Sequence, residues 1–204
     1  MGEDRFERYD RCLVEVLDLL CLVPPPPPAG DERKSRHARR SWQRRSALMI
    51  MREARPPLPE ELFEPLVRAA VYEPDPSHTQ RHIRPALAAF GRRRVQTRLL
   101  EYLRTGTDYE IGGAADAWYC SCLRIVDSDA EGDPCTDLRH EFQEAGLHTF
   151  LVNDNLRIRC RIISLLNLRA DENCPQLRPL VTEVLRIAHA HSDATFANRI
   201  SRGP

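Results

Sequence analysis

The sequence predicts an all-α protein built from stacked antiparallel helix pairs, and three observations support this fold class. Apolar residues recur at helical spacing along most of the chain. No segment alternates apolar and polar residues between hairpin turns. A similar helix-start pattern returns about every 40 residues, as in helical repeat proteins. With 204 residues, the chain is long enough for one substantial core or a short repeat array.

The chain divides into four predicted segments. They are an N-terminal amphipathic helix at residues 1–23, a Pro-rich linker at 24–34, an Arg-rich helix at 35–57 and helical repeats at 58–204. The run from Pro24 to Pro28 cannot continue a helix and favours a stiff, extended spacer. The Arg-rich helix is expected from about Ser35 to Ala54, because an apolar pattern resumes at Leu48.

The repeat region predicts successive helices with one buried face each. Prolines at the start and Gly91 at the end delimit the second helix. The expected inner-face residues are Leu62, Leu66, Val67, Ala70 and Val71, then Ile83, Ala86, Leu87 and Phe90, then Val95, Leu99, Tyr102 and Leu103, then Ile111, Ala114, Ala115, Trp118 and Cys122. Two further pairs are expected in residues 136–168 and 175–201, and Leu156 and Trp118 are expected in the core.

The second helix of each pair is expected to begin with a short polar residue and an apolar residue three positions later. These residues are Asp108 with Ile111, Asn153 with Leu156 and Asp193 with Phe196, and Asp75 with His78 is a poorer copy. The polar side chain is expected to accept hydrogen bonds from the N–H groups of the first turn. The apolar side chain would then point inward.

These helix starts resemble those of the HEAT-repeat family, in particular the bacterial HEAT-like proteins. The family pattern is a turn containing Asp, an apolar residue and then Arg, and "NDNLR" fits it best with Leu156 and Arg157. Gly112 and Ala197 stand where the arginine would be in the other copies. The resemblance covers residues 58–201 and implies an α-α superhelix. An armadillo-like or another α-α stacking is the alternative.

Two adjacent glycines, Gly112 and Gly113, lie near the start of a predicted helix, where each glycine costs up to about 1 kcal/mol relative to alanine. One interpretation is that they permit a close approach between packed helices. The other is a phosphate-binding loop at a helix N-terminus. The second reading lacks a preceding strand and a recognised glycine-rich motif. The sequence therefore favours close packing.

The resemblance implies a non-catalytic interaction module that binds a protein partner on the concave face of the solenoid, which second helices line. The expected partner-binding residues are Arg92, Arg93, Arg94, Asp108, Glu110, Asp116, Tyr119, Arg157 and Arg161. The main alternative is nucleic-acid binding by the Arg-rich segment through Arg39, Arg40, Trp42, Arg44 and Arg45, with the indole stacking on a base.

A third hypothesis is a DNA glycosylase, because some HEAT-like proteins resemble alkylpurine DNA glycosylases. Asp116 would then act as the catalytic carboxylate, with Trp118 and Tyr119 beside the base and Arg92 to Arg94 on phosphates. No nucleophile motif, metal-ligand motif or cofactor motif accompanies these residues. His78 and His82 share the spacing of two metal ligands, but turn or surface positions are expected for both.

Composition adds few constraints on function. The 30 basic and 30 acidic residues give no net charge, so no global field favours nucleic acid. The seven cysteines contain no CxxC pair, and we expect reduced thiols in a cytoplasmic protein. No apolar stretch has the length of a transmembrane helix. Neither a cofactor nor a small-molecule substrate is expected.

Overall fold

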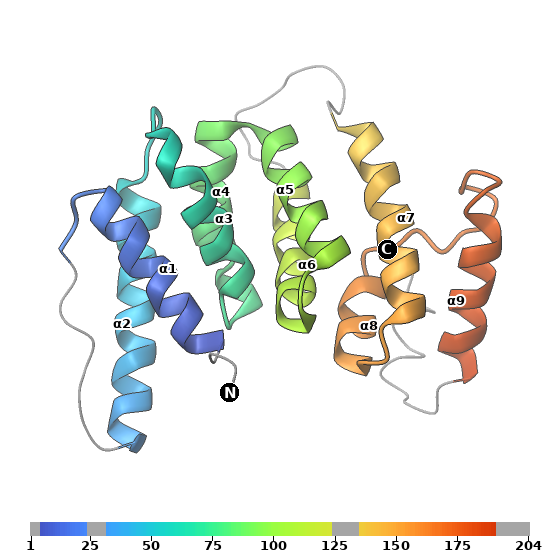
Figure 1. The fold of residues 1–204 in the computed structure, drawn as a ribbon, viewed down its shortest axis with the longest axis horizontal. Helices are drawn as coiled ribbons and strands as arrows, with labels where there is room; N and C mark the ends of the chain where they lie inside the picture. The colour runs from blue at the N-terminus through green and yellow to red at the C-terminus, as the bar shows by residue number, and fades with distance from the viewer. Residues whose placement is uncertain (1–4, 24–31, 124–134, 191–204) are drawn as a thin grey trace.

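The computed structural model describes residues 5–23, 32–123 and 135–190, and every regular element in these ranges is a helix (Figure 1). The predicted all-α class is therefore confirmed for this part of the chain. The elements are α1 (Arg5–Leu19), α2 (Glu32–Glu53), η1 (Glu60–Leu62), α3 (Phe63–Tyr72), η2 (Pro76–His78), α4 (Gln80–Phe90), α5 (Arg92–Thr105), α6 (Asp108–Cys122), α7 (Thr136–Val152), α8 (Leu156–Ile163) and α9 (Arg178–Ala190).

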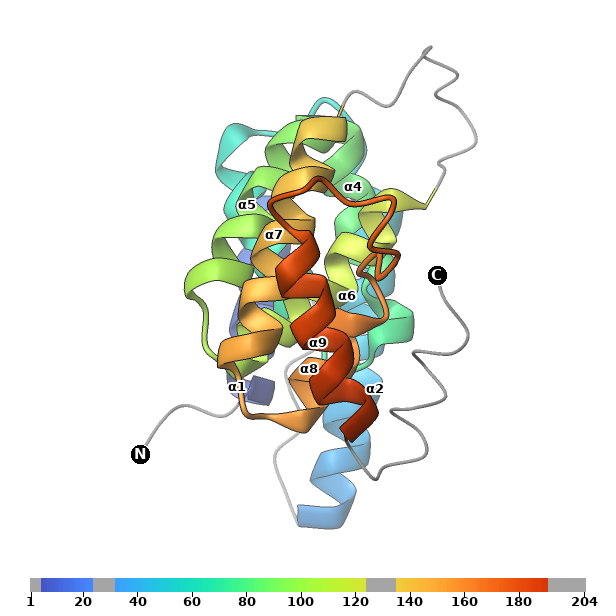
Figure 2. The same cartoon turned by 90° about the vertical axis from the view of Figure 1, so that its right-hand side faces the viewer.

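The helices form a repeat-like array of two rows. The first row contains α1, α3, α5, α7 and α9, and the second row contains α2, α4, α6 and α8; each helix contacts its neighbours within its row. Figure 2, which looks along the array, shows α1, α5 and α7 on one side and α2, α4 and α6 on the other. Successive helices also pair across the rows, so α3 contacts α4 and α5 contacts α6.

The apolar faces of both rows meet in one continuous core. The predicted inner-face residues are buried there, apart from Phe90 and Cys122, which are partly buried. Trp118 is a core residue, as expected, and its ring stacks on Phe142 with a centroid separation of 4.3 Å. Leu156 is also only partly buried, because it occupies the first position of α8 at the edge of the array.

The N-terminal helix α1 packs against α2 and α3 and contributes to the same core. It runs antiparallel to α3, because Arg5 donates to the carbonyl groups of Tyr72 and Glu73 at the end of α3, whereas Glu15 pairs with Arg68 further back. A cation at a helix C-terminus is favourable. The helix thus covers the apolar end face that a terminal repeat would otherwise expose.

The helix caps differ from the predicted ones by one or two residues. Thr107 precedes α6, and the Glu110 carboxylate accepts from its N–H and hydroxyl groups at 2.7 and 2.8 Å. Asn155 caps α8 by accepting from the Arg157 N–H group. Asp108 and Asn153 do not cap these helices. Asp75 does accept from the Ser77 N–H group, as expected, although the helix that it caps is the short η2.

The two adjacent glycines of α6 lie at close helix contacts, which confirms the packing interpretation. A methyl group at Gly113 would lie 2.7 Å from the carbonyl carbon of Val71 on α3 and would overlap the oxygen. A methyl group at Gly112 would instead meet the Arg161 and Ile158 side chains of α8. Only a residue without a side chain lets the backbones of α3 and α6 approach to this distance.

Two predicted segments lie outside the described residues. They are the proline run Pro24–Pro28 and the last predicted helix, which contains Asp193 and Phe196. In the described ranges, no helix is both long enough and apolar enough to cross a membrane.

Candidate functional site

Several charged side chains of the first row form ion pairs with neighbouring elements. Each pair joins an arginine to a carboxylate on the next element. The pairs are Arg68 with Glu15, Arg98 with Glu64, Arg94 with Glu60, Arg93 with Asp137 and Arg104 with Glu141. Burial raises the pKa of Glu64, but hydrogen bonds from Arg98 and Tyr102 outweigh it and leave that pKa below its usual value. The first row therefore satisfies much of its own charge.

The arginine run Arg92 to Arg94 belongs to this network of structural contacts. Arg92 donates to the carbonyl oxygen of Ser121 at the end of α6, and Arg93 pairs with Asp137 of α7. The third guanidinium pairs with Glu60 and lies 4.0 Å above the centre of the Phe63 ring. The three side chains thus tie the start of α5 to three different elements.

The predicted residues at the start of α6 also make structural contacts. Asp108 accepts from the side-chain amides of Asn153 and Asn155 at 2.7 and 2.8 Å, which joins the turn before α6 to the turn before α8. Glu110 accepts from the Tyr72 hydroxyl. These two acids lie about 20 Å from the arginine run along the 14-residue helix α5. The structure therefore does not gather the nine predicted partner-binding residues into one patch.

Four of the nine lie together on the outer surface of α6 and α8. Arg161 reaches across the flat surface left by Gly112 and pairs with Asp116 at 2.9 Å. Arg157, one turn earlier on α8, is exposed. Tyr119 lies one turn after Asp116 and is 55% exposed. This group is the part of the predicted site that the fold assembles.

Two residues that the sequence interpretation missed extend this group. Arg84 of α4 is exposed and lies close enough to Cys120 to act on the pKa of its thiol, although burial is the main cause of the rise of that pKa to about 11. Tyr109 in the first turn of α6 is 62% exposed. For Tyr109 the sequence held a signal, because Tyr109, Gly112, Asp116 and Tyr119 follow one stripe of a helix. We call these residues, with Arg157 and Arg161, the α4–α6–α8 face.

Asp116 is the only acidic residue of the α4–α6–α8 face, and its surroundings control its charge. Burial raises the pKa of Asp116 above its usual value, while Arg161 and Arg5 lower it and only partly offset burial. Neither α4 nor α8 contains an acidic residue. Arg84 and Arg157 have no ion-pair partner among the residues that the structure describes. The face consequently carries an excess of positive charge.

The residues proposed for DNA glycosylase chemistry are not assembled. The Trp118 ring is buried against Phe142 and cannot hold a base. The arginines proposed as phosphate contacts are instead engaged by Ser121, Asp137 and Glu60. Asp116 is paired with Arg161 rather than free to act on a substrate.

Two of the five residues expected to bind nucleic acid, Arg39 and Trp42, are engaged in contacts within the protein. Trp42 is 1% exposed, so its indole is not available to stack on a base, as the nucleic-acid alternative requires. The helical spacing of α2 places it on the buried face with Ala47 and Ile50. Arg39 pairs with Asp10 of α1 at 2.5 Å. Arg40, Arg44 and Arg45 remain exposed on α2.

A buried polar cluster at the end of α3 was not expected from the sequence. Glu73 accepts from the hydroxyl of Tyr9, which also lies 2.9 Å from Nε2 of His82. His82 is fully buried, so the expectation of a turn or surface position is wrong for it. Burial raises the pKa of Glu73, but contacts with His82 and hydrogen bonds from Tyr9 and the Asp75 N–H outweigh it and lower that pKa. The cluster fastens α1 to α3 and α4.

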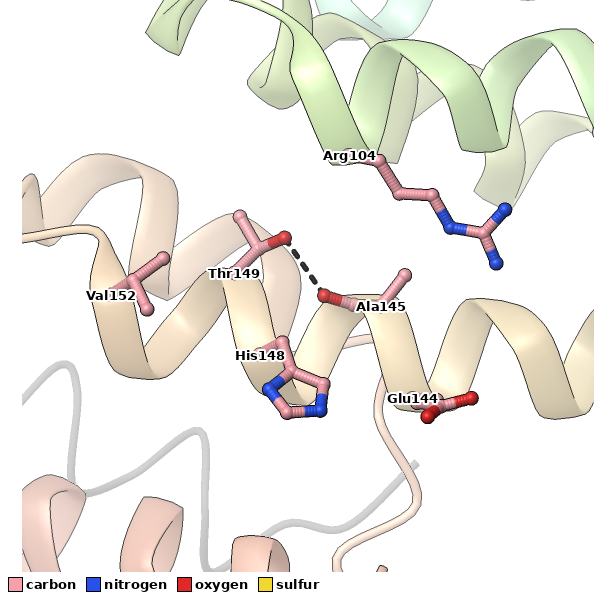
Figure 3. A pocket seen from close by; sticks show the side chains of 6 residues that line it. All are labelled: Arg104, Glu144, Ala145, His148, Thr149 and Val152. Carbon is pink, nitrogen blue, oxygen red and sulfur yellow. Dashed lines mark hydrogen bonds between the residues drawn. The ribbon is translucent and has the colours of Figure 1, made fainter.

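A shallow pocket of about 350 Å³ lies between α5 and α7. Figure 3 shows that its polar side chains do not converge: Arg104 approaches from α5, whereas His148 and Glu144 project from another side of α7. Its Thr149 hydroxyl already donates to the Ala145 carbonyl group. The pocket is therefore a gap between packed helices rather than a built ligand site.

Neither a metal site in the described residues nor a comparison with known proteins indicates a function. Within the described ranges, no group of three His, Cys, Asp or Glu side chains is arranged to hold a metal ion. None of the seven cysteines forms a disulfide bond. Comparison of the chain with protein-family models, with curated proteins and with solved structures gives no match.

Proposed function

We propose that this chain is a non-catalytic, HEAT-like solenoid that binds a protein partner on the α4–α6–α8 face. The observation that carries the proposal is the contrast between the rows. Exposed arginines of α5 in the first row, namely Arg93, Arg94 and Arg104, are held in ion pairs with neighbouring elements, whereas Arg84 and Arg157 of the second row have no ion-pair partner among the described residues. Charged side chains that do not stabilise the fold are available for recognition.

The composition of the face supports a protein as the partner. Tyrosine and arginine are enriched at the energetic centres of protein interfaces. Tyr109 and Tyr119 expose more than half of their surfaces, and arginines lie on both sides of them. In a HEAT-like solenoid, second helices line the concave side, so these residues would face an elongated partner.

Site-specific photo-crosslinking tests this proposal. A photoreactive phenylalanine analogue replaces Tyr119 on the proposed face or Thr97 on the exposed surface of α5. The proteins are irradiated in lysate of the source cells, and adducts are identified by mass spectrometry. We expect a protein adduct from position 119 and none of the same mass from position 97. Equal yields at the two positions, or adducts from position 97 alone, would place the partner elsewhere.

A further inference from the structure

The α4–α6–α8 face has a buried glycine near its centre and exposed arginines on both sides. The outer stripe of α6 includes Gly112, over which Arg161 lies, and its other central residue is Asp116. Arg84 on α4 flanks the stripe on one side, and Arg157 on α8 flanks it on the other. Because the only carboxylate of the face is already paired, negative charge brought by a ligand would meet unopposed guanidinium groups.

We propose that this face recognises an acidic peptide segment of the protein partner, a proposal that rests on the function proposed above. Arginine binds carboxylates through a planar, bidentate arrangement of N–H donors. Arg84 and Arg157 supply such donors on α4 and α8 without first breaking an ion pair among the described residues. Carboxylates of the segment pair with these two residues, and its chain lies over α6 between them.

The tyrosines set the size and composition of the segment. Tyr109 and Tyr119 are ten positions apart on one helix, which places them about 15 Å apart along its axis. An extended peptide covers that distance with about five residues. Tyrosine offers an apolar ring and a polar hydroxyl. The segment that fits therefore combines Asp or Glu with apolar side chains that cover the two rings.

The face suits a peptide better than a nucleic acid. A nucleic-acid groove follows a phosphate backbone with continuous positive charge and closely spaced stacking rings. Here Asp116 interrupts the positive charge, and the two exposed rings are about 15 Å apart along the helix axis. Trp42, the residue proposed to stack on a base, is buried. The sequence as a whole carries no net positive charge.

Fluorescence anisotropy with the full-length protein tests the proposal. The probe is a labelled 12-residue peptide of alternating glutamate and leucine, and the reference peptide carries glutamine in place of each glutamate. A labelled 12-nucleotide single strand of thymidine is the third ligand. The test variant combines Arg84→Glu with Arg157→Glu. The control combines Arg104→Glu with Arg186→Glu on the first row and makes the same change in net charge. Thermal melting by circular dichroism confirms that both variants fold.

We expect the acidic peptide to bind, the glutamine peptide to bind at least about tenfold more weakly, and added salt to weaken the acidic complex. The test variant should lose about tenfold or more in affinity, and the control should change by less than about threefold. Equal loss in the two variants would mean that net charge, rather than this face, governs binding. If the thymidine strand binds more tightly than the acidic peptide, the proposal of a peptide ligand is wrong and the face binds nucleic acid.

The test separates this inference from the function on which it rests. If position 119 crosslinks a protein but the acidic peptide does not bind at millimolar concentration, the face binds a partner of other chemistry and the acidic segment is wrong. If neither position 119 crosslinks a protein nor the peptide binds, the α4–α6–α8 face itself is wrong as an interface.

Discussion

Arginines of α5 in the first row and two arginines of the second row differ in their surroundings. In the first row, Arg98 pairs with Glu64 across the α3–α5 boundary and also lies 4.4 Å above the centre of the Tyr102 ring. In the second row, Arg84 and Arg157 are exposed and make no ion pair with any described residue. A chain without net charge can therefore present one positively charged face, because several carboxylates of the described first row are paired with arginines of that row.

We expect the largest loss of stability from a substitution at Gly113, where α6 of the second row contacts α3 of the first row. Gly113→Ala places a methyl group against the Val71 carbonyl group, so the free energy of unfolding should fall by about 3 kcal/mol. Gly112→Ala meets the mobile end of the Arg161 side chain, and its effect should stay within about 1 kcal/mol because alanine favours the helix. Urea denaturation measures both, and equal losses would show that the close approach of α3 and α6 is not needed.

The polar cluster under α1 should give the next largest effect. Glu73→Gln removes the buried carboxylate that Tyr9 and His82 contact, and we expect a loss of about 2 kcal/mol at neutral pH. The folded pKa of Glu73 lies below the usual value of 4.5, so its stabilising contribution is present above that pH and disappears as pH falls through the folded value.

Denaturation at several pH values checks this linkage. The difference in stability between the wild type and Glu73→Gln should shrink as pH falls below about 4.5. The exposed Glu61 provides the matched control, and Glu61→Gln should change stability by less than about 0.5 kcal/mol. A difference that stays constant down to the acid limit would contradict the role given to the Glu73 carboxylate.

The ion pairs of the first row should have a modest effect. Arg98→Met keeps the apolar stem but removes the pairs with Glu64 and Glu101, and we expect a loss of about 1 kcal/mol in low salt. Sodium chloride at 1 M should reduce the difference between wild type and variant, because the pair is partly exposed and salt screens it. A loss that does not respond to salt would point to packing on Tyr102 instead.

The second row should show the smallest effect on stability. Arg84→Glu combined with Arg157→Glu removes no ion pair among the described residues, so the free energy of unfolding should change by less than about 0.5 kcal/mol. The same urea experiment measures it. A loss as large as that of Arg98→Met would remove the distinction between the rows and the reason to assign recognition to the second.

Helical periodicity was enough to predict the fold class and most of the core. It placed Trp118 correctly, because residues on one helix face share one environment. The absence of a phosphate-binding motif around Gly113 also favoured close packing over ligand binding, and the structure places Gly113 at a helix contact. The caps were displaced because Thr107, Asp108, Asn153 and Asn155 are all short polar residues, and only the backbone path decides which one takes the N-cap position.

The candidate face could be predicted only in part. Asp116, Tyr119, Arg157 and Arg161 share their surface because of local helical spacing and the packing of α8 on α6. The arginine run of α5 looked equally suitable, since a sequence does not reveal which carboxylate a long side chain will reach. Asp137 is 44 positions from Arg93, so their pairing depends on how neighbouring helices stack. Tyr9, Glu73 and His82 were missed for the same reason.

The contact of Gly113 with Val71 has a consequence for how this chain could be divided. Repeat arrays are often treated as modular, with each helix pair removable or exchangeable. Here the C-terminal end of α3, at Val71, fits against Gly113 of α6 in the next pair, so we expect the segment from Phe63 to Cys122 to behave as a single four-helix block. Fragments or chimaeras of this protein that include this block should begin before α3 and end after α6, and a cut between α4 and α5 should leave both halves unable to pack.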